Sequence, residues 1–103
     1  MAHFAVVTMR GPAWDATRGI REQRLWTEHA RFTDDLVAAG SIVIGGPIES
    51  PDGRVIALLA VEADDENAVR TLFSPDPWIE EGVIELMHVR RWTLWLDGRA
   101  PLR

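Results

Sequence analysis

His29 is the residue of this sequence best suited to move protons near neutral pH. It lies within a helical pattern whose apolar positions include Leu25, Phe32 and Leu36. The chain contains no Cys, Tyr or Lys. This composition excludes thiolate attack, phenol acid chemistry and Schiff-base formation by a side chain, and it leaves His, Asp and Glu for acid–base catalysis.

His29 has two interpretations on spacing alone. A single His on an apolar helix face is often a hydrogen-bonded core residue. An imidazole, whose ordinary pKa is about 6.5, can also act as a general base if a carboxylate orients its other ring nitrogen. Glu28 does not share the face of His29, and Asp34 and Asp35 lie five and six residues further along the chain. We therefore expect the carboxylate to come from another element.

Asp76 is the candidate partner. Pro77 disfavours the α region for the residue before it, which keeps Asp76 extended in a loop. An Asp followed by Pro is also a common way to begin a short helix, here over residues 78–81. A carboxylate has enough lone pairs to cap a helix and orient an imidazole at once, so the two roles are compatible. Most of the five Trp residues should serve packing, but we expect Trp78, two residues on, beside a pocket.

The elements that must position these residues follow the order βαββαβ. Apolar periodicity and the Gly and Pro breakers predict strands over residues 4–9, 42–44, 54–61 and 83–96, and helices over residues 18–39 and 65–73. This order predicts an α+β fold of the ferredoxin-like type, with a four-stranded antiparallel sheet and two helices on one face.

The predicted strands are apolar at nearly every position over residues 5–7 and 55–61. A sheet with one solvated face should instead alternate apolar and polar residues. Because two helices cover only one face, we predict an obligate homodimer in which two open sheet faces pack about 10 Å apart.

Length and charge limit the classes of protein. The 103 residues favour a single domain over residues 1–103. The net charge of -5 argues against nucleic-acid binding. We expect no membrane span and no signal peptide, because neither a long apolar run nor a basic start followed by an apolar core is present. The expected location is the cytoplasm.

We expect neither a metal nor a cofactor. The three His residues form no HxH or HExxH pair. The glycines before Pro47 match neither phosphate-binding pattern, GxGxxG or GxxxxGK[ST], and are more simply the exit of a strand.

Two groups of residues resemble a known family. The first is His29 followed by Gly40 and a short strand that ends in Gly46-Pro47, and the second is Asp76-Pro77-Trp78 followed by Gly82-Val83. Together they resemble the YCII-related (YciI-like) proteins, which are small dimeric α+β barrel proteins. The resemblance spans nearly the whole chain and implies that His29 and Asp76 form an active-site pair at the mouth of a pocket.

The resemblance also implies a class of reaction. One member is a dehydrochlorinase of a chlorinated hydroxyhydroquinone, and the wider superfamily includes muconolactone isomerases and cofactor-free monooxygenases. It implies a cofactor-independent lyase or isomerase that acts on a small cyclic or aromatic compound. Trp26 stands where members commonly carry Arg, which implies a more apolar pocket wall. The substrate-binding residues we expect are Trp26, Gly46, Pro47 and Trp78.

Two other functions stay open at this point. The protein could be a non-catalytic module that binds a small molecule or a partner, with His29 as a structural residue. A cofactor-free monooxygenase is the third possibility, and nothing in the sequence selects it.

Overall fold

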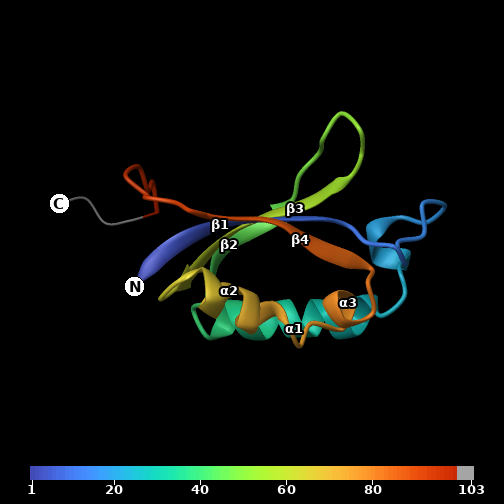
Figure 1. Cartoon of the computed structure of the whole chain (residues 1–103), viewed down its shortest axis with the longest axis horizontal. Helices are drawn as coiled ribbons and strands as arrows, with labels where there is room; N and C mark the ends of the chain where they lie inside the picture. Colours follow the sequence, from blue (N-terminus) through green and yellow to red (C-terminus); the bar gives the residue numbers. More distant parts are fainter. Residues whose placement is uncertain (100–103) are drawn as a thin grey trace.

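The structure, a computed structural model that describes residues 1–99, has the predicted ferredoxin-like α+β fold. Four antiparallel strands form one sheet in the order β2-β3-β1-β4. Three helices lie on one face of this sheet (Figure 1). The strands are β1 (Ala2–Arg10), β2 (Ile42–Pro47), β3 (Val55–Ala63) and β4 (Ile84–Arg91), and the helices are α1 (Trp26–Ala38), α2 (Glu66–Phe73) and α3 (Pro77–Glu80).

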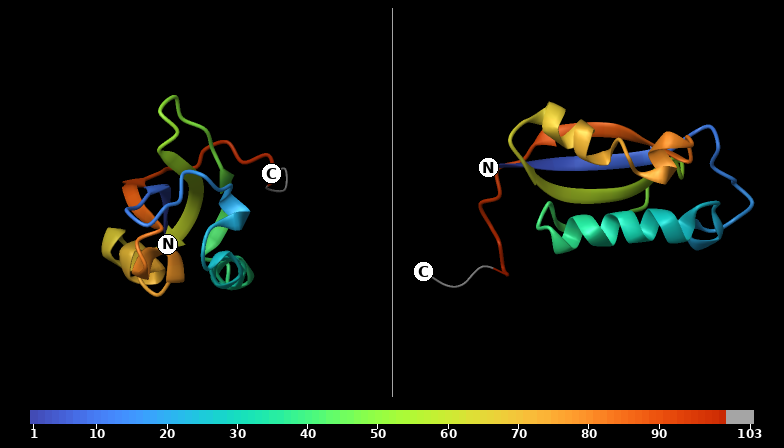
Figure 2. Two further views of the ribbon diagram at one scale, coloured as in Figure 1. Left: turned by 90° about the vertical axis from the view of Figure 1, so that its right-hand side faces the viewer. Right: turned by 90° about the horizontal axis from the view of Figure 1, so that it is seen from below.

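The helices divide the covered face between them. Helix α1 packs against β2, whereas α2 contacts β3 and β4 and α3 contacts β4. Seen from below, α1 runs under one half of the sheet and α2 with α3 under the other (Figure 2). No helix within residues 1–99 is long and apolar enough to cross a bilayer.

The first helix starts later than predicted. A helix from residue 18 is wrong, because α1 begins at Trp26 and only a single 3₁₀ turn, Ile20–Glu22, precedes it. The break lies at Leu25, whose φ of 61° places it in the left-handed region that a right-handed helix cannot continue through. The spacing of apolar residues does not predict a single residue in the left-handed conformation.

The last strand also differs from its prediction. Strand β4 ends at Arg91, not at Leu96. The backbone N–H of Trp92 donates to the carbonyl of His3 at 2.9 Å, close to the start of β1 at Ala2. Beyond this point β1 has no further residues with which β4 could pair. Strand β2 is longer than predicted, and its Gly45-Gly46-Pro47 segment is part of the strand, not its exit.

The core lies between the sheet and the helices, in two clusters. One joins the strands to α2 and includes Phe4, Val6, Val61, Val69 and Phe73. The other lies at the α3 end of the sheet and includes Ile56, Trp78, Val83 and Ile84. Helix α2 is capped by Asp65 and buries Val69 and Phe73.

The opposite face of the sheet carries apolar side chains with no helix over them. Val7 and Leu58 are paired across β1 and β3, and Ile44 of β2 is 56% exposed. The loop between β2 and β3 rises above this face, away from the helices (Figure 1). A hollow of about 280 Å³ on this side is lined by β2, β3 and Trp92. We call this surface the open face.

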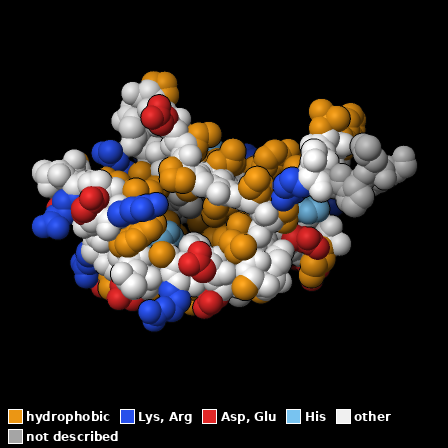
Figure 3. Space-filling view, turned by 180° about the vertical axis from the view of Figure 1, so that it is seen from behind, with side chains coloured by type: hydrophobic (Ala, Val, Ile, Leu, Met, Phe, Trp, Pro, Cys, Tyr) orange, Lys and Arg blue, Asp and Glu red, His pale blue; other side chains and the backbone are white. Residues whose placement is uncertain are grey.

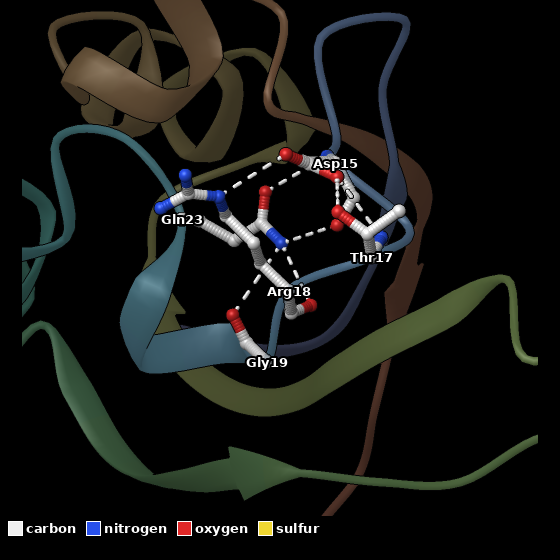
Figure 4. A network of polar contacts seen from close by, with 5 residues as sticks. All are labelled: Asp15, Thr17, Arg18, Gly19 and Gln23. Atoms are coloured by element: carbon white, nitrogen blue, oxygen red, sulfur yellow. Dashed lines mark hydrogen bonds and ion pairs between the residues drawn. The ribbon is translucent and has the colours of Figure 1, made fainter.

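Gln23 holds the loop that joins β1 to α1 (Figure 4). Its side chain is 3% exposed. The amide oxygen accepts from the backbone N–H of Asp15 at 2.9 Å, and the amide nitrogen donates to the carbonyls of Asp15 at 2.7 Å and Arg18 at 3.0 Å. Thr17 donates its hydroxyl to the Asp15 carboxylate and thereby lowers the pKa of that carboxyl. This loop fixes the direction in which the chain enters α1.

Substitution of Gln23 by Ala should lower the free energy of unfolding by about 1–3 kcal/mol, because the part-buried backbone groups of Asp15 and Arg18 lose their hydrogen-bond partner. Urea denaturation followed by Trp fluorescence measures the change. Arg21→Ala, in the same loop but exposed, is the matched control and should stay within about 0.5 kcal/mol of the unchanged protein. Equal effects of the two substitutions would contradict this role for Gln23.

Candidate active site

His29 and Asp76, the two residues proposed as a pair, lie in direct contact. Nδ1 of His29 is 2.9 Å from each carboxylate oxygen of Asp76. The side chain of His29 is 14% exposed and that of Asp76 is 1% exposed. The two residues come from α1 and from the start of α3, so the packing of α1 beside α3 creates the pair.

The Asp76 carboxylate also caps α3. Its Oδ1 accepts from the backbone N–H of Trp78 at 2.9 Å, and Pro77 occupies the first turn, where its missing N–H costs nothing. Asp76 itself has φ −58° and ψ 123°, outside the helical region, as the following proline requires. One carboxylate therefore performs both roles that the sequence left open, and α3 holds it in place for His29.

Trp78 fixes the imidazole from a second side. The indole and the imidazole are stacked, with ring centroids 3.9 Å apart and an angle of 7° between the planes. The indole N–H donates to the carbonyl of Arg24 at 2.6 Å, and the rings of Trp14 and Trp26 pack around it. One face of the Trp78 ring is thus covered by His29.

The contact with Asp76 selects the tautomer of His29. When the carboxylate is ionised it can only accept hydrogen bonds, and Nδ1 then carries the proton. In the neutral ring Nε2 then keeps its lone pair. The arrangement can accept a proton at Nε2 and stabilise the resulting imidazolium through Asp76, which is the chemistry of a general base.

The pair lies in the wall of a cavity of about 410 Å³ between α1 and the sheet. Figure 3, from behind, shows a hollow with hydrophobic side chains between the two layers. The predicted site residues all line this cavity, and apolar side chains from the strands make up half of the remaining lining residues. The predicted residues are Trp26, His29, Gly46, Pro47, Asp76 and Trp78.

Several lining residues escaped the sequence analysis. Thr8 lies on the central strand, Ile20 in the 3₁₀ turn, and Thr33 and Asp34 on α1. A signal existed for Thr8, because it follows Phe4 and Val6 at the alternating positions of β1 that face the core, where a polar side chain is unusual. For Ile20 there was none, since its position depends on the irregular loop before α1.

Within residues 1–99, the structure contains no group of three His, Asp or Glu side chains that could hold a metal ion. His3 lies 3.8 Å from Glu62, and His88 contacts Arg90, so neither joins His29.

Asp76→Ala should lower the free energy of unfolding by about 2–4 kcal/mol, because it removes a helix cap and also leaves a buried imidazole nitrogen without its partner. Asp65→Ala is the matched control: Asp65 caps α2 through the N–H of Ala68 but has no imidazole neighbour, and its loss should cost about 1 kcal/mol. Chemical denaturation of both variants gives the two values. Equal losses would show that the contact with His29 contributes nothing to stability.

Comparisons with known proteins place the chain in a family. The sequence profile of the YCII-related domain matches residues 6–93. A search of curated proteins found no match. Among solved structures, the fold is similar to that of 5-chloro-2-hydroxyhydroquinone dehydrochlorinase from Burkholderia phenoliruptrix, in complex with 2,5-dihydroxybenzoquinone, with a TM-score of 0.66, 21% identity, and coverage of 88% of this chain and 93% of that one. The chain belongs to the YCII-related family.

Proposed function

We propose that the protein is a cofactor-independent lyase or isomerase that acts on a small cyclic compound, aromatic or enolisable. One observation carries the proposal: His29, whose Nδ1 contacts the buried carboxylate of Asp76, lies in the wall of a mainly apolar cavity. A cavity of about 410 Å³ is within the range of small-molecule sites. In this proposal His29 is the general base and Asp76 orients it.

The reaction begins when Nε2 of His29 takes a proton from a hydroxyl group or an acidic carbon of the substrate. The electron pair of the broken bond moves into the ring of the substrate. In a lyase, an anionic group then leaves with its bonding pair; in an isomerase, His29 returns the proton to another carbon. Asp76 stabilises the imidazolium between these steps, and the π face of Trp78 offers it a second favourable contact.

The structural neighbour supports this class of substrate. Its name describes the removal of chloride from a hydroxylated ring, and its structure holds a hydroxylated quinone. The planar, oxygen-bearing ring is the feature that we carry over to this chain. Aromatic residues around His29, among them Trp26, suit such a ring.

A non-catalytic binding module is the second candidate. The same stacking and hydrogen bond that orient His29 would also satisfy a purely structural imidazole. The two functions differ in what happens at Nε2, because only a general base needs that nitrogen to exchange protons with a ligand.

A test compound that reacts by losing a proton to any suitably placed base can distinguish the two functions. In 5-nitrobenzisoxazole, loss of the proton on C3 to a base breaks the N–O bond and releases a coloured phenolate. We expect the protein to accelerate this reaction and His29→Ala to lower the rate by about 10²-fold, the contribution typical of a general base. Absorbance of the phenolate measures the rate.

His3→Ala, which removes an imidazole outside the cavity wall, is the control and should keep the full rate. Release of chloride from 5-chloro-2-hydroxyhydroquinone tests the activity of the structural neighbour on this chain. Unchanged proton abstraction by a folded His29→Ala protein would favour the binding module instead.

We further propose that two copies associate through their open faces. Val7, Leu58 and Ile44 form an apolar surface there that the helices of the same chain do not cover. A second sheet at about 10 Å is the simplest layer that would remove this surface from water. The dimer would have a twofold axis, because the same face is used by both copies.

Leu58→Arg should therefore convert a dimer into a monomer, since it places a charge in the centre of the apolar contact. Gel filtration with light scattering at low micromolar concentration measures the mass. Ala38→Arg, at an exposed position of α1, is the control and should leave the dimer intact. A mass of 11.6 kDa for the unchanged protein would refute the association.

A further inference from the structure

Thr8 is a buried polar residue that the fold leaves without a partner. It is 3% exposed, and its hydroxyl makes no hydrogen bond with any group among residues 1–99. A buried hydroxyl without a partner is destabilising, and strands are normally apolar at such positions. Thr33, the other Thr of the cavity wall, instead donates to the carbonyl of Ala30 at 3.0 Å. Of these two hydroxyl groups, Thr8 is thus the one whose donor is unused.

The sheet is irregular on both sides of Thr8. The register of β1 against β3 shifts between Thr8 and Met9, and the register against β4 shifts between Val7 and Thr8. Each shift leaves an extra residue in the neighbouring strand, Ile56 in β3 and Met87 in β4. Such irregularities re-aim side chains and are frequent beside binding sites. Two of them at one residue mark Thr8 as a position where the sheet is adapted locally.

Thr8 and His29 line the same cavity from opposite layers. Thr8 belongs to the sheet, and His29 belongs to α1. The Thr8 oxygen is closed to solvent. A hydrogen bond from Thr8 to a ligand therefore requires rotation about χ1, the torsion that sets the positions of the hydroxyl and methyl groups. A compound that bridges the two residues needs one oxygen for His29 and a second oxygen for Thr8.

We propose that Thr8 is a second ligand-binding residue of the cavity and that it selects rings with two oxygen substituents over rings with one. The inference rests on the proposed function and narrows its substrate class. The ring lies between the two layers, with one hydroxyl facing Nε2 of His29 and the other hydroxyl or a carbonyl bonded to Thr8.

Binding of phenol and of the three dihydroxybenzenes tests the proposal, in the absence of oxygen and with Trp fluorescence as the readout. Thr8→Val removes the hydroxyl but keeps the branched shape, and Thr8→Ser keeps the hydroxyl. Thr8→Val should bind the preferred dihydroxybenzene about three- to tenfold more weakly than the unchanged protein and should bind phenol equally well. Thr8→Ser should recover most of the lost affinity.

Thermal unfolding provides an independent readout with the opposite sign. Thr8→Val should melt at the same temperature as the unchanged protein or higher, because it removes a buried hydroxyl that has no partner. Weaker binding by a protein of undiminished stability cannot come from damage to the fold. A purely structural Thr8 would instead give a lower melting temperature and equal losses for phenol and the dihydroxybenzenes.

Three results overturn the inference. In the first, Thr8→Val binds every dihydroxybenzene as tightly as the unchanged protein. In the second, Thr8→Val loses as much affinity for phenol as for the dihydroxybenzenes. In the third, the unchanged protein binds phenol as tightly as all three isomers. Each of these leaves the proposed function of His29 standing. An unchanged protein that binds none of the four rings contradicts the proposed function and, with it, this inference.

Discussion

The site depends on one buried carboxylate. Asp76 is almost completely removed from water, where an isolated carboxylate is very unfavourable. It is tolerated because two groups meet it: the backbone N–H of Trp78 and the ring nitrogen of His29. The requirement acts in both directions. The beginning of α3 cannot move away from α1 without separating the carboxylate from the imidazole, so the geometry of the candidate site and the packing of the two helices depend on the same contact.

Features of the fold that depend on the pattern of side chains could be predicted from the sequence. The order of elements and the position of the helices on one face of the sheet follow from apolar spacing and from the Gly and Pro breakers. Features that depend on backbone conformation or on strand pairing could not be predicted. Tertiary contacts set the left-handed conformation of Leu25 and the end of strand pairing near Trp92. Local sequence patterns predict neither feature.

The site was predictable to a similar extent. Asp76 could be identified because the proline after it restricts its backbone, and His29 because it interrupts an apolar stripe. Their contact could not be deduced from the spacing of 47 residues, which says nothing about how α1 approaches α3. The stacking of Trp78 on His29 could not be predicted either, since an aromatic residue beside a pocket can face the pocket or a neighbouring side chain in its wall.

Strand β2 separates the cavity from the open face by the thickness of a single strand. Ile44, Gly45, Gly46 and Pro47 line both the cavity and the hollow next to Trp92. Gly45 has no room for a side chain beside Leu59, so this wall is thin by necessity. Any shift of β2 changes the shape of the cavity and of the open face together. If a second copy covers the open face, the free energies of association and of ligand binding are linked, and each changes the other by the same amount.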